Sequence, residues 1–130
     1  MEKLLASCLC GGVRFEIPAQ FEHAGFCHCT TCKKISGGVG TASALVPTDS
    51  IRIISGADLL RTYRPAEGSA KTFCATCGSN LFGANWPDSE HASVRLPAID
   101  SAFVGRPLSH GFTRSVAPWE TLPDDGLPRK

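Results

Sequence analysis

Seven cysteines constrain the fold of this 130-residue chain more than any other feature. They stand in three groups: a first group of Cys8 and Cys10, a middle group of Cys27, Cys29 and Cys32, and a last group of Cys74 and Cys77. An odd number of thiols cannot pair off as disulfides, and clustered cysteines in a reducing compartment more often bind metal. We therefore expect a cytoplasmic protein whose small fold is held together by metal ions.

The spacing of the cysteines favours one closed metal site and one open metal site. The last group reads C-x-x-C-G, in which two intervening residues let both sulfurs reach one tetrahedral zinc ion at about 2.3 Å. The following Gly78 permits a left-handed turn at that point. Pairing the last group with the first completes a four-sulfur site and leaves the middle group with three ligands. A vacant fourth position is typical of catalytic zinc, so two zinc ions per chain are expected.

Spacing alone leaves other partitions open. A zinc ribbon built from Cys29, Cys32, Cys74 and Cys77 also satisfies the C-x-x-C rule and strands the remaining three thiols. A redox role, or one structural metal with bystander cysteines, is a further alternative.

The rest of the sequence indicates a mainly β fold of small curved antiparallel sheets. Short strand-like segments separated by turn residues are expected at 12–17, 39–46, 51–54, 59–63, 71–73 and 94–99. One short helix is expected to start after Thr30 or Thr31, with Thr30 as its cap, and to end at Gly37 and Gly38. We expect one domain over 1–130, with a core at about 5–117 and an irregular arm at 118–130. The core is expected to include Phe15, Phe73, Phe82 and Phe112.

Composition argues against two classes of partner. Thirteen Lys and Arg residues balance twelve Asp and Glu residues, so no basic field predicts nucleic-acid binding. No apolar run approaches the roughly 18 residues of a membrane span. The apolar stretch before Cys8 is shorter than the roughly 7 to 15 residues of a signal peptide, so no lipoprotein anchor is expected.

Three ordered motifs carry a resemblance to a known family. CLCGGVRF begins at Cys8, CHCTTCKKISGG begins at Cys27, and FCATCGSNLFG begins at Phe73. With the closing segments SVAPW and DGLP, these motifs resemble the glutathione-dependent formaldehyde-activating enzyme family, which also includes centromere protein V. The resemblance implies several coiled sheets with a structural zinc on the first and last cysteine groups and a catalytic zinc on Cys27, Cys29 and Cys32.

The resemblance also implies an activity, namely condensation of formaldehyde with glutathione to S-(hydroxymethyl)glutathione, a carbon-sulfur lyase reaction written in reverse. The expected partners are a small thiol and a small electrophile. Because its first cysteine is at position 8, we expect this chain to lack the N-terminal extension of longer members, which makes another thiol an alternative to glutathione. A non-enzymatic binding module, with its second zinc site closed by a fourth protein ligand, is the alternative of a different class.

The charge of the metal group, and the alternation of side chains along a strand, predict roles for residues beside the middle group. Three thiolates on a zinc dication give the unit a formal charge of about −1, so a neighbouring cation should offset it. Lys33 and Lys34 directly follow Cys32, and we expect one of them to point at the site as part of the catalytic set. Strand-like alternation should turn His28 away from the metal. The other histidines are expected to be structural or exposed.

Overall fold

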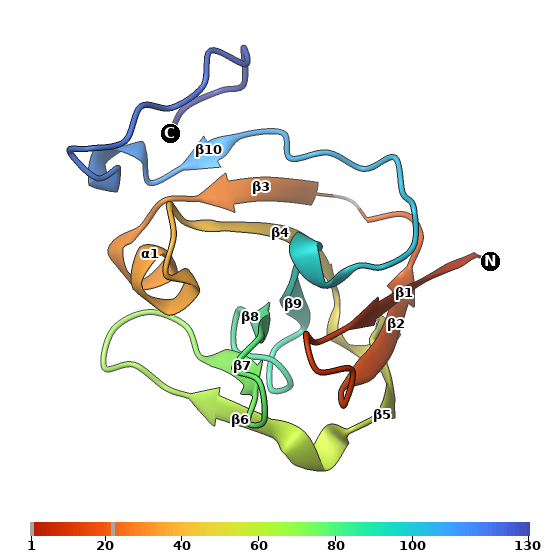
Figure 1. The fold of residues 1–130 in the computed structure, drawn as a ribbon. Coiled ribbons are helices and arrows are strands. Elements are labelled where there is room, and N and C mark those ends of the chain that lie inside the picture. Colours follow the sequence, from red (N-terminus) through yellow and green to blue (C-terminus); the bar gives the residue numbers. More distant parts are fainter. Residues whose placement is uncertain (1, 22) are drawn as a thin grey trace.

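The strands form two sheets in the computed structural model, which describes residues 2–21 and 23–130 (Figure 1). The three-stranded sheet has the order β1-β2-β5, made of β1 (Lys3–Ser7), β2 (Arg14–Pro18) and β5 (Arg52–Ser55). The seven-stranded sheet has the order β10-β3-β4-β9-β8-β7-β6. Its members are β10 (His110–Gly111), β3 (His23–Cys27), β4 (Thr41–Pro47), β9 (His91–Arg95), β8 (Asn80–Gly83), β7 (Lys71–Cys74) and β6 (Leu60–Tyr63).

Neighbouring strands run antiparallel except for the short parallel pair of β10 and β3. Helical structure in the described residues is one α-helix, α1 (Thr30–Ser36), and four single 3₁₀ turns: η1 (Thr48–Ser50), η2 (Ala57–Leu59), η3 (Leu96–Ala98) and η4 (Thr113–Ser115). The predicted mainly β class, with little helix, is therefore confirmed.

Several strand boundaries differ from the sequence expectations. The segment expected at 94–99 is instead β9 at His91–Arg95, followed by a 3₁₀ turn that contains Pro97. Strands β1, β3, β8 and β10 were not predicted. β3 has the sequence HAGFC, and its alanine and glycine have low strand propensity, so pairing with β4 rather than local preference makes it a strand.

The core lies where the two sheets meet. Phe15 of β2 and Phe82 of β8 are both fully buried, and their ring centroids are 4.8 Å apart. Aromatic pairs at this distance add packing energy beyond the area they bury. Phe73 is half-buried, whereas Phe112 is 52% exposed, so the expectation that Phe112 belongs to the core was wrong. Phe112 adopts a left-handed backbone conformation (φ 56°) at the rim of the cavity described below.

The cap of helix α1 lies one residue earlier than predicted. The cap is Cys29 rather than Thr30, because the Cys29 sulfur accepts a hydrogen bond from the Cys32 amide at 3.4 Å. The helix ends, as predicted, at Gly37, whose left-handed conformation (φ 68°) lets its amide bond back to the Lys33 carbonyl.

The C-terminal segment returns alongside β10 (Figure 1). The His110 amide donates to the Pro128 carbonyl at 2.9 Å, and the Lys130 amide donates to the His110 carbonyl at 2.8 Å. Residues 128–130 thus extend the edge of the larger sheet. Across residues 2–21 and 23–130, no helix has the length and apolar character needed to cross a membrane.

Candidate metal centres and active site

The middle cysteine group is placed by the junction of β3 and α1. β3 ends at Cys27, Cys29 caps the helix, and Cys32 lies in the first helical turn. The chain returns to β4 through Gly40, where a Cβ atom would lie 2.2 Å from the Cys27 carbonyl oxygen. Only glycine allows this close approach, which holds the end of β3 against the start of β4.

Cys27, Cys29 and Cys32 bring their sulfur atoms within 4.8 Å of one another. Cys32 is buried, and the other two are half-buried. Three thiolates converging on one point are a suitable donor set for zinc, which binds Cys sulfur readily. Among the described residues this cluster consists of the three sulfurs, so the chain supplies three of the four ligands of a tetrahedral ion.

The first and last cysteine groups come together in a second cluster, at the β1–β2 and β7–β8 turns. The sulfurs of Cys8, Cys10, Cys74 and Cys77 all lie within 4.8 Å of one another. The Cys8–Cys10 and Cys10–Cys74 sulfur distances are 3.6 and 3.9 Å. Tetrahedral zinc with bonds of about 2.3 Å separates its sulfurs by about 3.8 Å, so the four positions fit a closed zinc site.

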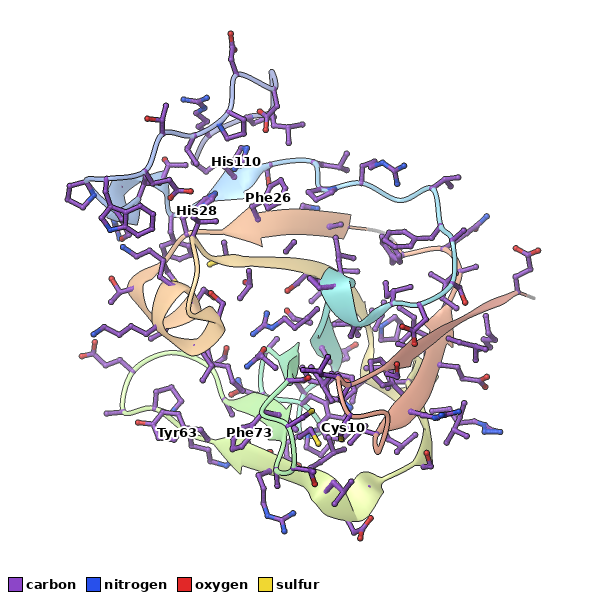
Figure 2. The ribbon with its side chains drawn as sticks, in the orientation of Figure 1. Cys10, Phe26, His28, Tyr63, Phe73 and His110 are labelled. Atoms are coloured by element: carbon purple, nitrogen blue, oxygen red, sulfur yellow. The ribbon has the colours of Figure 1, made fainter. Side chains whose placement is uncertain are left out.

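Backbone and hydroxyl donors surround the four-sulfur cluster. The Val13 amide donates to the Cys8 sulfur at 3.2 Å. A hydrogen bond from Ser79, together with the Ser79 and Cys10 backbone amides, lowers the pKa of Cys77 to about 5. These donors favour thiolates, the form in which cysteine binds metal. The labelled Cys10 lies away from His28, which flanks the middle group, so the two clusters occupy different parts of the fold (Figure 2).

Arg95 of β9 is the cation that the structure places beside the middle group. It is buried (7% exposed), its Nε donates to Asn80 Oδ1 at 2.5 Å, and its Nη1 donates to Ser43 Oγ at 2.7 Å. Burial lowers the pKa of the Arg95 guanidinium, and the charges of the three cysteines oppose that shift. The hydrogen bond with Cys27, helped by the Thr41 hydroxyl and the Arg95 charge, lowers the pKa of Cys32 to about 5.

Neither lysine of the sequence expectation lies against the sulfurs. Lys33 Nζ donates to the Ser115 carbonyl, which ties α1 to the turn at η4. Lys34 is exposed on the helix surface. Consecutive side chains of a helix point in different directions around its axis. Adjacency to Cys32 in the sequence therefore did not place either ammonium group at the site.

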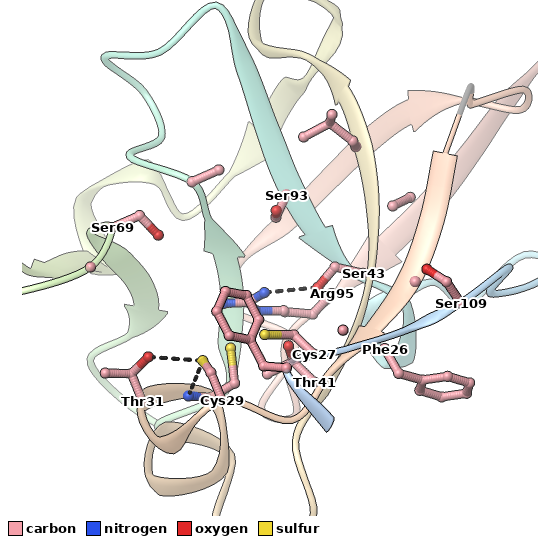
Figure 3. A pocket seen from close by; sticks show the side chains of 18 of the residues that line it. Phe26, Cys27, Cys29, Thr31, Thr41, Ser43, Ser69, Ser93, Arg95 and Ser109 are labelled. Carbon is pink, nitrogen blue, oxygen red and sulfur yellow. Dashed lines mark hydrogen bonds between the residues drawn. The ribbon is translucent and has the colours of Figure 1, made fainter. Parts of the chain in front are cut away.

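A cavity of about 500 Å³ opens over the middle group (Figure 3). All three of its cysteines line the cavity, together with Arg95 and Lys71. Figure 3 shows Cys27, Cys29 and Arg95 around one opening, with Ser43 bonded to the guanidinium. A volume of this size is in the range of small-molecule sites.

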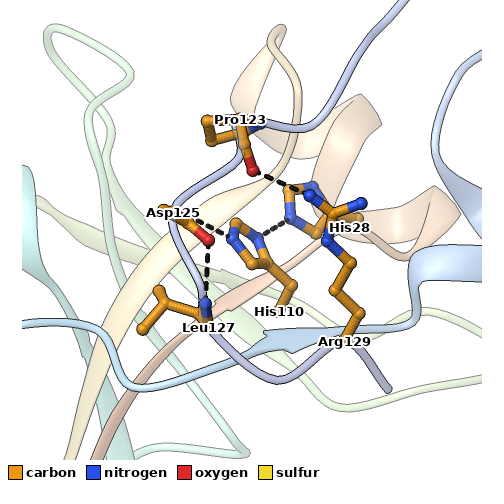
Figure 4. Close-up of polar contacts among 6 residues, drawn as sticks. All are labelled: His28, His110, Pro123, Asp125, Leu127 and Arg129. Carbon is orange, nitrogen blue, oxygen red and sulfur yellow. Dashed lines mark hydrogen bonds and ion pairs between the residues drawn. The ribbon is translucent and has the colours of Figure 1, made fainter.

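His28 points into a buried polar network instead of toward the sulfurs (Figure 4). Its Nδ1 donates to the Val39 carbonyl at 3.1 Å, and its Nε2 bonds to His110 Nδ1 at 2.8 Å. His110 Nε2 bonds in turn to Asp125 Oδ2 at 2.8 Å, which lowers the pKa of Asp125. Both histidines are buried, and Phe26 stacks on His110 with a centroid distance of 4.8 Å (Figure 2). The network links the loop that carries the cysteines to the C-terminal segment.

The protons of this network can be counted from its ends. The Val39 carbonyl and the Asp125 carboxylate are both acceptors, so the three hydrogen bonds require three protons. Two neutral imidazoles carry two protons. The network is therefore fully bonded only when it holds one additional proton.

Sequence reasoning assigned no role at the site to Arg95, Lys71 or His110. Each becomes relevant only because sheet pairing brings it to a buried position, and no motif marks that position. The strand glycine Gly83 was the available signal for Arg95, because a Cβ there would lie 2.6 Å from the Arg95 guanidinium. Glycine within a strand often marks such a close approach.

Comparison with known proteins agrees with this arrangement. The sequence profile of the family described as "Glutathione-dependent formaldehyde-activating enzyme" matches residues 3–115. A Halomonas elongata protein, named as a candidate member of that enzyme class, is 31% identical over 106 residues, covering 75% of this chain and 66% of that protein. A Penicillium rubens protein of the same name is 27% identical over 117 residues, covering 88% of this chain and 61% of that protein.

The chain thus spans about two thirds of the length of the curated relatives it matches. A Rhodobacter sphaeroides protein solved by crystallography shares the fold, with a TM-score of 0.63 and 22% identity over 76% of this chain and 90% of that one. Since the family profile matches nearly the whole strand framework and both cysteine clusters, the chain belongs to the glutathione-dependent formaldehyde-activating enzyme family.

Proposed function

We propose that this protein is a zinc-dependent carbon-sulfur lyase that catalyses reversible addition of a thiol, glutathione or a related one, to formaldehyde. The observation that carries this proposal is the convergence of three sulfurs, with no fourth protein ligand among the described residues, on the wall of a cavity of about 500 Å³. A metal held in this way can present its fourth position to a substrate. Family membership supports glutathione and formaldehyde as the substrates.

Cys27, Cys29 and Cys32 would hold the catalytic zinc, and Cys8, Cys10, Cys74 and Cys77 would hold the structural zinc. Zinc bound to the middle group would supply a positive charge that favours the thiolate form of an incoming thiol. Arg95 offsets the negative charge that three thiolates bring to the site. We propose no catalytic contact for Lys33, which bonds to the Ser115 carbonyl, or for the exposed Lys34.

The reaction balances without a further reactant. The thiol sulfur forms a bond to the formaldehyde carbon, the carbon-oxygen double bond becomes a single bond, and the proton lost from sulfur ends on the former carbonyl oxygen. The cavity contributes by holding the two reactants beside each other, which lowers the entropic part of the barrier.

Exchange spectroscopy by NMR tests this proposal directly. With protein loaded with zinc, we expect exchange between glutathione and its formaldehyde adduct to exceed the spontaneous rate, and we expect Cys29→Ser to abolish the increase. Exchange that stays at the spontaneous rate with the loaded wild-type protein would exclude glutathione as the substrate.

The alternative of a non-enzymatic module requires a closed second site. Cobalt substitution distinguishes this module from the proposed enzyme. If four protein ligands close the site, the absorption spectrum of the bound cobalt does not change when a thiol is added. We expect the cobalt spectrum of the middle group to change on addition of glutathione. We also propose a cytoplasmic location, since none of the seven cysteines forms a disulfide, as expected in a reducing compartment.

A further inference from the structure

Lys71 is a buried cation that forms no ion pair with the carboxylates of the described residues. Its side chain lies on β7 and is 5% exposed. Nζ donates to the Ser69 carbonyl at 2.8 Å and to the Ser69 hydroxyl at 3.4 Å. The ion pairs found among residues 2–21 and 23–130 do not include Lys71, so no carboxylate in this part of the chain pairs with it. An ammonium group has three N–H donors. Ser69 accepts two of those of Lys71, and no described residue accepts the third.

Arg95, the other buried cation that lines the cavity, has charged groups and hydrogen-bond acceptors around it. Arg95 faces the sulfurs of the middle group, and its Nε and Nη1 donors are taken by Asn80 and Ser43. Burying a charge without a partner costs folding free energy, because water no longer solvates it. Arg95 offsets that cost with the cysteine charges, whereas Lys71 has only the uncharged oxygens of one serine.

Lys71 and Ser69 line the same cavity as the three cysteines. Figure 3 shows Ser69 on the segment that precedes β7, across the opening from Cys29 at the start of α1. A molecule whose sulfur approached the cysteine cluster would thus have its other end within the part of the cavity that Lys71 lines.

We propose that Lys71 is a specificity-determining residue that binds a carboxylate of the thiol substrate. This inference rests on the proposed function and adds that the substrate is an anionic thiol. A carboxylate accepts charge-assisted hydrogen bonds from an ammonium group, and such bonds are stronger than those between neutral groups. The ligand would supply the countercharge that the chain omits.

Lys71→Met tests the proposal, because it removes the charge and keeps an unbranched side chain of similar length. The readout is the ratio of kcat/KM for 3-mercaptopropionate to that for uncharged 2-mercaptoethanol, each with formaldehyde. We expect the wild-type protein to prefer the anionic thiol and Lys71→Met to lower the ratio about 10- to 100-fold, the usual loss for a hydrogen bond to a charged group. The loss should appear mainly in KM.

Two further variants separate charge binding from structure. Lys71→Arg retains the charge and should keep the preference for the anionic thiol, at least in part. Lys3→Met removes a charge from an exposed position on β1 and should leave the ratio unchanged. Thermal unfolding of Lys71→Met should occur at or above the wild-type midpoint, since the substitution relieves a buried charge.

Calorimetric titration with S-methylglutathione decides the point independently of catalysis, because this probe has carboxylates and no free thiol. Binding to the zinc-loaded wild-type protein, weakened about tenfold or more by Lys71→Met, supports the subsite even if no thiol exchange is accelerated. Equal binding by both proteins, no binding to the wild type, or an unchanged thiol ratio in the variant would overturn it.

Discussion

At the scale of single residues, the charge balance of the middle cysteine group depends on Arg95. The guanidinium is buried on β9, far along the chain from the cysteines, and is oriented by Asn80 and Ser43. Groups that orient or neutralise metal ligands from outside the ligand set commonly affect metal affinity strongly. A positively charged residue in the sequence neighbourhood of the cysteines, such as Lys34, is not equivalent when its side chain faces solvent.

We therefore predict that Arg95→Met weakens zinc binding at the middle group by about 10- to 100-fold. The physical reason is the loss of the one buried cation that faces the three thiolates in the described structure. Competition with a chromophoric chelator measures this affinity. Arg106→Met, which removes an exposed arginine, is the matched control and should leave it unchanged. Wild-type affinity in Arg95→Met would show that the guanidinium does not compensate the cluster.

At the scale of elements, the start of α1 combines a structural and a chemical role in one side chain. Cys29 caps the helix through its sulfur and also belongs to the three-sulfur cluster. Serine is among the best helix caps, whereas alanine cannot accept the hydrogen bond. The two roles of Cys29 can therefore be separated by substitution.

We predict that Cys29→Ser spares most of the fold and loses the metal of the middle group, while Cys29→Ala is less stable than Cys29→Ser by about 1 kcal/mol. Chemical denaturation with a parallel zinc assay measures both effects. Equal stability of the two variants would contradict the capping role.

The four-sulfur cluster should contribute more to the stability of the fold than the middle cysteine group does. Cys74 is fully buried, and its cluster joins the β1–β2 turn to the β7–β8 turn. Structural zinc contributes folding free energy on the order of 10 kcal/mol in small metal domains. Cys74→Ser should therefore unfold or strongly destabilise the protein, and a chelator should remove zinc from the middle group first. Similar loss of stability in Cys74→Ser and Cys29→Ser would contradict a division between structural and catalytic sites.

At the scale of the whole molecule, the His28–His110–Asp125 network joins the C-terminal segment to the metal loop (Figure 4). Asp125 is the charged end of this network. Its hydrogen bond from His110, and a second from the Leu127 amide, lower its pKa below the ordinary value of 3.8. A carboxyl group with a lowered pKa stabilises the folded state above the unfolded pKa, and this contribution is lost as the pH falls toward the folded value.

We predict that Asp125→Asn loosens the C-terminal segment near pH 6. The effect should shrink as the pH is lowered below 3.8 and the wild-type carboxylate, whose pKa lies under that value, is protonated. Hydrogen exchange of the His110 and Lys130 amides, whose hydrogen bonds join β10 to this segment, measures the effect as protection factors. Protection should fall severalfold at the higher pH. A difference between variant and wild type that is the same at both pH values would exclude the carboxylate charge as its cause.

The sequence by itself predicted the mainly β class and, through its three ordered motifs, the family. The count of thiols favoured a four-sulfur and a three-sulfur group, and the resemblance implied the same division, but spacing alone also allowed a zinc ribbon that the folded positions of the sulfurs do not form. The helix end at Gly37 was likewise predictable, because its left-handed conformation is a local property of glycine.

Only the tertiary structure decided which other residues surround the three sulfurs. Arg95, Lys71 and Thr41 come from three different strands and meet through non-local sheet pairing, which short-range patterns do not encode. The same pairing buries His28 against His110, 82 positions apart in the sequence, and leaves Lys34 in solvent. Charge beside a metal group is a property of three-dimensional distance and burial, so proximity along the chain was a poor guide to it.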